Sequence, residues 1–115
     1  MADQKDISMT IKSIELVSEN IIIYYCKYWY QEDIPFLIEQ LLYIADAFET
    51  KENIIGADRE SFRVSWQNKA QFVINFDYYS QSCWIESIDE SSKELLNRVY
   101  EQLEQSLLQR GKLVR

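Results

Sequence analysis

Three apolar runs separated by short polar breaks make up the stretch FRVSWQNKAQFVINFDYYSQSCWIESI, residues 62–88. Apolar and polar side chains alternate in the first two runs, which is typical of strands with one buried face. The stretch therefore predicts a three-stranded antiparallel meander on which helices can pack. The apolar residues that share one face form the predicted floor of the core: Phe62, Val64, Trp66, Phe72, Ile74 and Phe76.

The first turn of the meander must contain an odd number of residues. Trp66 and Phe72 can share a face only if the strands pair at even offsets, because a slip of one residue reverses every side chain. We therefore predict a three-residue loop or a bulge at residues 68–70, with Gln67 opposite Gln71.

The second turn is compatible with two loop residues near positions 79–80. This register places Cys83 opposite Phe76 in the core. It sends Trp84 and Val73 to the opposite face of the sheet, where they share one surface.

Two strands and a helix are predicted ahead of the meander. Residues 11–17 alternate weakly, as in an outer strand, whereas residues 21–30 are apolar or aromatic on both sides, as in a central strand. Asp33 is expected to cap a helix that runs to about Phe48 with a single apolar stripe. The irregular residues 49–61 are predicted to form a loop.

A second helix is predicted after the meander, because Ser91 and Glu94 have capping-box spacing and Gly111 follows Arg110 as a stop signal. Its apolar stripe consists of Leu95, Leu96, Val99, Leu103 and Leu107. The expected fold class is α+β: an antiparallel sheet of about five strands with two helices, in the order β-β-α-β-β-β-α. The helices should lie mainly on one face of a single domain, residues 1–115, whose first eight residues are frayed.

Composition excludes several classes of function. Apolar residues make up 47% of the 115 residues, so the chain can bury a core, and its net charge of −7 repels nucleic acid and anionic membranes. The chain contains no histidine, which removes the commonest general base and most zinc sites. No glycine-rich phosphate loop is present. The sequence therefore favours a non-enzymatic protein and indicates no catalytic, metal or cofactor residues.

Cysteine usage and hydropathy indicate the compartment. Cys26 and Cys83 belong to no CxxC pair and are expected to be reduced core thiols, joined only if their strands are neighbours. The N-terminus has no apolar signal region, and no apolar run reaches the roughly 20 residues of a membrane span. We therefore expect a cytoplasmic location.

The first helix is expected to present an acidic surface. Residues 31–52 include six acids and one base, a net charge of −5, and Glu39 and Asp46 lie on the outer side of the helix. Such a surface could receive a basic protein, as an immunity protein or a chaperone does. The alternative is an ordinary solvated helix face.

The face opposite the core is expected to be aromatic. Tyr25 and Trp29 alternate on one side of the central strand, and Trp84 and Val73 share the outer face of the meander. Exposed aromatic patches usually mark interfaces. The leading hypothesis is therefore a domain that binds a protein partner, or itself, through this face or through the acidic helix. The alternative is that another segment buries these side chains.

A small-ligand protein is the second hypothesis. An apolar or aromatic pocket between the sheet and the helices would be lined by Tyr24, Tyr28 and Trp66 and would bind, or turn over, a small aromatic or apolar ligand. A filled core at the same place would exclude it.

One segment resembles a known group of proteins. Residues 56–87 combine a Gly-Ala-Asp-Arg lead-in with the strand Ser-Cys-Trp-Ile-Glu. In this segment the chain resembles a domain-of-unknown-function family of short acidic bacterial proteins. The resemblance implies no activity and no site residues.

Overall fold

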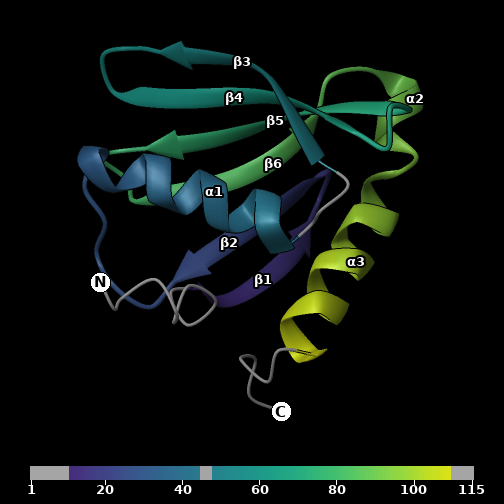
Figure 1. Ribbon diagram of the computed structural model, residues 1–115, viewed down its shortest axis with the longest axis horizontal. Helices are drawn as coiled ribbons and strands as arrows, with labels where there is room; N and C mark the ends of the chain where they lie inside the picture. Colours follow the sequence, from purple (N-terminus) through teal and green to yellow (C-terminus); the bar gives the residue numbers. More distant parts are fainter. Residues whose placement is uncertain (1–10, 45–47, 110–115) are drawn as a thin grey trace.

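The computed structural model describes residues 11–44 and 48–109. This part of the chain forms a six-stranded antiparallel sheet and three α-helices, which confirms the α+β class with one strand and one helix more than predicted (Figure 1). The strands are β1 (Ile11–Val17), β2 (Asn20–Tyr25), β3 (Phe48–Ile55), β4 (Arg59–Trp66), β5 (Ala70–Asp77) and β6 (Ser82–Ser87). The helices are α1 (Ile34–Ile44), entered through a 3-10 turn (Gln31–Asp33), α2 (Glu90–Lys93) and α3 (Leu96–Gln109).

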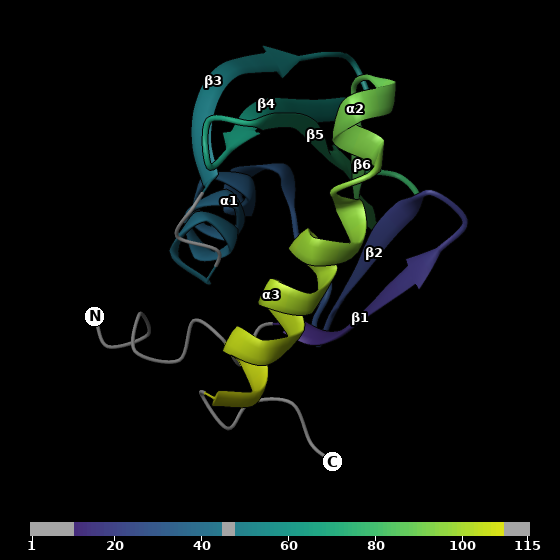
Figure 2. The same cartoon turned by 90° about the vertical axis from the view of Figure 1, so that its right-hand side faces the viewer.

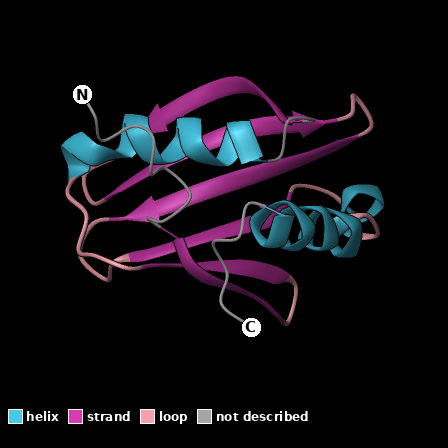
Figure 3. Cartoon of the chain, turned by 60° about the horizontal axis from the view of Figure 1, so that its bottom comes forward, coloured by secondary structure: helices cyan, strands magenta, loops and turns pink. Residues whose placement is uncertain are grey.

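The strands lie in the order β1-β2-β6-β5-β4-β3, and every neighbouring pair is antiparallel (Figure 3). The meander is therefore intact, and β2 closes against its last strand. β2 is an interior strand and β1 an outer strand, as the apolar patterns of residues 21–30 and 11–17 predicted.

The two long helices, α1 and α3, lie on the same side of the sheet (Figures 1 and 2). All six predicted floor residues of the meander are buried on that side, and so are Leu96, Val99, Leu103 and Leu107 of α3. The core is the layer between the sheet and these helices. No helix in the described part of the chain covers the other side of the sheet, which we call the open face.

The first turn of the meander confirms the predicted faces and corrects the predicted register. Trp66 pairs with Ala70, so the three-residue loop consists of residues 67–69 and not 68–70. Gln67 and Asn68 both have left-handed backbones, with φ of 54° and 57°. Compared with the prediction, the loop begins one residue earlier, and each β4 residue pairs with a β5 residue two positions earlier. An even shift leaves every side chain on its predicted face. The second turn leaves Cys83 opposite Phe76, as predicted.

The predicted loop at residues 49–61 is wrong, because β3 and the start of β4 occupy it. β3 is an edge strand in which only Phe48 is buried, so it lacks the apolar alternation that identifies most strands. A bulge near Lys51 shifts the register and disturbs the pattern further. Phe48 begins this strand instead of ending the first helix.

The N-cap of α2 is Asp89, and not Ser91 as predicted. The Asp89 carboxylate oxygen Oδ1 accepts a hydrogen bond of 2.8 Å from the Ser92 backbone N–H. The Ser92 hydroxyl in turn accepts from the backbone N–H of Gln71 at 2.8 Å, which ties the helix to β5. The predicted stop signal at Arg110 and Gly111 lies outside the described residues.

The capping carboxylate makes the stability of the fold depend on pH. Hydrogen bonds from the Ser92 side chain and backbone lower the pKa of Asp89 below its ordinary value. A lowered pKa stabilises the folded state above the unfolded pKa of about 3.9, and this contribution is lost as pH falls through the folded value. Asp89→Asn keeps a capping oxygen but does not titrate. Urea unfolding between neutral pH and pH 3 should therefore show a shallower acid loss in the variant, and equal slopes would contradict this.

Candidate functional site

The open face presents one residue from each of the six strands in a single row across the sheet. Direct cross-strand partners define this central row, which consists of Glu15, Ile22, Trp84, Asn75, Ser61 and Ile54. Trp84 lies on β6, near the middle of the row. The open face therefore has an aromatic centre with polar residues on β4 and β5 and a carboxylate at its β1 edge.

The indole ring of Trp84 is held in place by its neighbours. The guanidinium carbon of Arg59 lies 5.3 Å from the ring centroid, and the indole N–H donates to Glu86 Oε1 at 3.4 Å. A cation over an indole at an exposed site contributes about 0.5–1 kcal/mol. Trp84 is half-buried, so part of the ring remains available for contact.

Polar side chains extend outward from Trp84 in a hydrogen-bonded ladder. The Ser61 hydroxyl donates to Asn75 Oδ1 at 2.7 Å, and Asn75 Nδ2 donates to Glu86 Oε2 at 3.4 Å. Asn75 is only 1% exposed, because the side chains around it cover it. These hydrogen bonds fix the orientation of the Ser61, Asn75 and Glu86 side chains.

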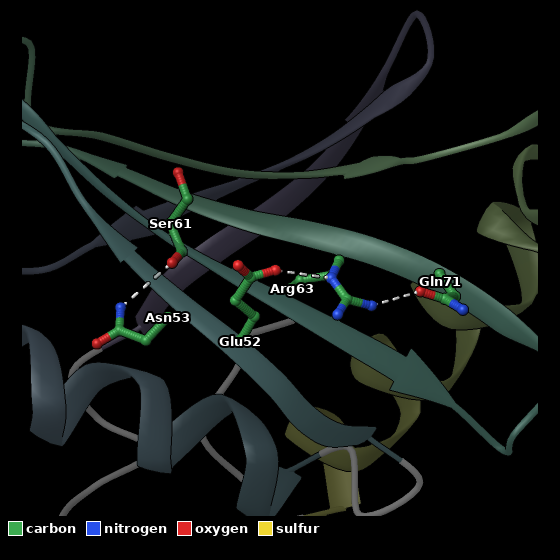
Figure 4. A network of polar contacts seen from close by, with 5 residues as sticks. All are labelled: Glu52, Asn53, Ser61, Arg63 and Gln71. Atoms are coloured by element: carbon green, nitrogen blue, oxygen red, sulfur yellow. Dashed lines mark hydrogen bonds and ion pairs between the residues drawn. The ribbon is translucent and has the colours of Figure 1, made fainter.

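A second set of polar contacts joins the three strands at the β3 end of the sheet. Figure 4 shows Arg63 between Glu52 and Gln71. Its Nε is 3.1 Å from Glu52 Oε1, and one terminal nitrogen donates to Gln71 Oε1 at 2.9 Å. In the same view Asn53 donates to the Ser61 carbonyl oxygen at 3.2 Å. Glu52, Arg63 and Gln71 form a polar rim beside the Trp84 centre, whereas Asn53 pairs with the core-side residue Phe62.

The prediction that Tyr25 and Trp29 lie on the open face is wrong. Tyr25 is half-buried on the core side of the sheet, where its hydroxyl lies 3.9 Å from the Cys83 sulfur. β2 ends at Tyr25, and the chain then turns so that Trp29 enters the core with only 4% of its surface exposed. The ring of Trp29 packs edge-on against Phe76, with centroids 5.6 Å apart. Trp84 and Val73 do lie on the open face, half-buried, as parity predicted. Next to the central row, Tyr24 is the exposed aromatic residue that the sequence did not assign to this face.

The predicted acidic surface of the first helix is not formed as expected. Among the residues of α1 only Glu39 is acidic, and Asp46 lies outside the described residues. Glu49 and Glu52 belong to β3, where they lie within 3.4 Å of Lys51 and 3.1 Å of Arg63. The six acids are therefore divided between elements, and part of their charge is neutralised locally.

The predicted pocket is brought together only in part. Tyr24 and Tyr28 line one open groove of about 520 Å³, next to Trp29. Trp66 is buried on the helix side, where its indole N–H donates to Gln102 Oε1 of α3 at 3.3 Å. The prediction of an aromatic ligand pocket between the sheet and the helices is therefore wrong.

Two titratable side chains that meet on the core side of the sheet, Tyr25 and Cys83, have raised pKa values. Burial raises the pKa of the Cys83 thiol, and it raises the pKa of the Tyr25 hydroxyl well above its ordinary value. Their atoms lie 3.9 Å apart in the core. Cys26, by contrast, is exposed and not a core thiol as predicted. Within residues 11–44 and 48–109, no cluster of three Cys, Asp or Glu side chains is arranged to hold a metal ion.

Residues 9–104 match the model of a family described as Protein of unknown function (DUF3630). The match extends well beyond the segment, residues 56–87, in which the resemblance was noted. No curated protein and no solved structure is significantly similar to the chain. Among the described helices, none is both long and apolar enough to cross a membrane.

Proposed function

Because the chain belongs to the DUF3630 family, whose function is unknown, we propose from its own surface that it is a protein-binding domain whose open face binds a second copy of the chain. The supporting observation is the half-buried Trp84 at the centre of a six-stranded face that none of the described helices covers. The proposed location is the cytoplasm, where an exposed thiol such as Cys26 stays reduced.

The arrangement of side chains on the open face supports this proposal. Interfaces concentrate their binding energy in a few central side chains, most often Trp, Tyr and Arg, inside a ring of polar residues that excludes water. Trp84, Ile22 and Val73 provide the apolar centre, and Arg63 with its contacts to Glu52 provides part of the rim. Because Arg59 and Glu86 already hold the ring of Trp84, little side-chain entropy is lost when a partner binds.

The size of the open face also suits a partner. Six strands spaced about 4.8 Å apart span roughly 24 Å, and strands of six to eight residues are about 20–27 Å long. The resulting area, about 600 Å² in projection, approaches the roughly 800 Å² of accessible surface per partner in a standard interface.

The charges on the open face are self-complementary. Glu15 of β1 lies two strands from Trp84 on one side, and Arg59 and Arg63 of β4 lie two strands away on the other. A two-fold axis running along β6 would place β1 of each copy over β4 of the other. Glu15 shares its row with Ser61, midway between the two arginines along β4. The Arg59 guanidinium reaches over Trp84, so the carboxylate of each copy would then lie nearest to Arg63 of the other.

Sedimentation measurements test the proposal. The wild-type protein should sediment as a dimer at micromolar concentration, and Trp84→Glu should sediment as a monomer because a charge replaces the apolar centre. Tyr79→Glu is the matched control, since Tyr79 is 81% exposed in the turn after β5, and it should remain a dimer. A wild-type protein that stays monomeric at high micromolar concentration rejects the proposal.

A charge exchange tests the orientation of the two copies. Glu15→Arg would place like charges over Arg63, and Arg63→Glu would place like charges over Glu15, so each variant alone should weaken the dimer. The double variant restores opposite charges and should recover much of the affinity. A dimer that the single variants do not weaken, or that the double variant does not recover, contradicts the two-fold arrangement along β6.

A further inference from the structure

A groove lies at one end of the β1–β2 hairpin, beside the open face. It has a volume of about 520 Å³, within the roughly 300–1,000 Å³ typical of small-molecule sites. Its lining comes from three places in the chain: the β1 bulge at Lys12, the end of β2 with the segment that follows it, and Gln81 in the turn between β5 and β6.

The wall of the groove is fixed by hydrogen bonds from one side chain. Gln81 Oε1 accepts from the Trp29 backbone N–H at 3.0 Å, and Gln81 Nε2 donates to the Trp29 carbonyl oxygen at 2.8 Å. Gln81 makes these contacts from a left-handed backbone, with φ of 58°. Trp29 packs against Phe76 in the core. Lys27 and Tyr28 come directly before Trp29 in the chain, so this contact holds the segment on which they lie.

The groove is locally basic although the whole chain is acidic. Lys12 and Lys27 both line it, and neither forms an ion pair with a described residue. The lining contains no carboxylate. The acid next to it, Glu15, accepts a hydrogen bond from the Tyr24 hydroxyl at 2.8 Å. Two ammonium groups and two tyrosine rings therefore border one hollow.

We propose that this groove binds a small organic anion that has an aromatic ring. The ammonium groups of Lys12 and Lys27 bind its carboxylate, phosphate or sulfonate, and Tyr24 and Tyr28 contact its ring. The ligand reaches the groove from solvent, because both lysines and both tyrosines are exposed.

A second hollow on the same hairpin provides an internal comparison. It has a volume of about 670 Å³ and lies at the β1–β2 turn, where Glu19 and Glu86 line it. Lys93 pairs with Glu19 at 2.8 Å from outside the lining, which leaves the hollow with a net negative charge. Anions should avoid this acidic hollow. Binding to the groove alone would therefore distinguish a specific site from general adhesion to concave surfaces.

The test is an NMR titration of the ¹⁵N-labelled chain with three aromatic anions that differ in their charged group: indole-3-acetate, adenosine monophosphate and 1-naphthalenesulfonate. At least one should cause saturable shifts of the Lys12, Tyr24, Lys27 and Tyr28 amides and leave Glu19 and Glu86 unmoved. The uncharged compounds indole, adenosine and naphthalene should bind about tenfold more weakly or worse, because they lack charge-assisted hydrogen bonds.

Matched variants separate charge from shape. Lys12→Gln combined with Lys27→Gln should weaken binding of the anion at least about tenfold. Lys69→Gln, an exposed change in the turn between β4 and β5, should leave it unchanged. The spectrum itself reports whether each variant is folded. No saturable shift with any of the three anions, or equal affinity in the double lysine variant, overturns the proposal.

The groove must also be distinguished from the open face, because Tyr24 borders both. The same titration with Trp84→Glu should give unchanged binding, since Trp84 does not line the groove. Loss of binding in that variant assigns the ligand to the open face and overturns the groove site. If the chain does not dimerise but the anion still binds at the groove, the groove proposal stands.

Discussion

Replacing Phe76 with alanine should lower the free energy of unfolding by about 3–5 kcal/mol, the usual cost of removing a buried phenylalanine ring. Phe76 is fully buried on β5, and its ring packs edge-on against Trp29 and Phe62, with centroids 5.6 and 6.0 Å away. The three rings come from different parts of the chain. Deleting the middle one leaves a cavity that neither neighbour can fill without leaving its rotamer.

Urea unfolding followed by circular dichroism measures this loss. Domains of this size are stabilised by about 5–15 kcal/mol in total, so the variant should be close to unfolding at 37 °C. Phe76→Leu retains much of the volume and should lose less. Tyr79→Ala, three residues away and 81% exposed, should change stability by no more than about 0.5 kcal/mol. A loss below about 1 kcal/mol for Phe76→Ala would show that the ring is not part of a close-packed core.

The same core explains why much of the fold could be predicted from the sequence. Alternation in β4 and β5 assigned six residues to one face, and all six are buried. Parity also assigned Trp84 to the other face, because a strand leaves only two directions for a side chain. Where a strand has one buried face, the alternation of apolar and polar residues was sufficient to predict which side chains enter the core.

β3 could not be predicted because it has almost no buried face. Its residues from Glu49 to Ile55 are all exposed, and the bulge near Lys51 interrupts what alternation remains. An edge strand is held by backbone hydrogen bonds to its neighbour, here β4. Because these bonds do not depend on the side chains, the sequence of β3 shows no strand pattern. Glu49 and Glu52, which were counted with the acidic surface of the first helix, therefore belong to β3, whereas Glu39 does lie on α1.

Trp29 illustrates a limit of a different kind. Its spacing from Tyr25 continues the alternation of β2, but the strand ends at Tyr25 and the next residues turn. What holds Trp29 is Gln81, 52 positions further along the chain, together with the ring of Phe76. A contact over that separation is decided by tertiary structure, so no local pattern in either segment indicated it.

The second large effect is expected at this contact. Gln81→Ala should lower the free energy of unfolding by about 2 kcal/mol, because the N–H and carbonyl of Trp29 would lose their partners, and an unsatisfied buried polar group costs about 1–3 kcal/mol. Hydrogen exchange of the Trp29 amide should accelerate more than exchange in β5, since the segment would open locally before the sheet unfolds.

Gln67 is a close control, because it has the same side chain and nearly the same left-handed backbone, with φ of 54° against 58° for Gln81. Its side chain forms no hydrogen bond to a described residue, and it is exposed. Gln67→Ala should therefore change little, and Gln67→Gly should stabilise by up to about 1 kcal/mol by relieving backbone strain.

Gln81→Gly would relieve the same strain while removing the side chain, so it should destabilise less than Gln81→Ala by a similar amount. The difference between the two glutamines then measures the hydrogen bonds to Trp29 with the backbone contribution removed. If Gln81→Ala cost no more than Gln67→Ala, the two bonds would not hold the Trp29 segment. The wall of the groove would then depend on the packing of Trp29 against Phe76 alone.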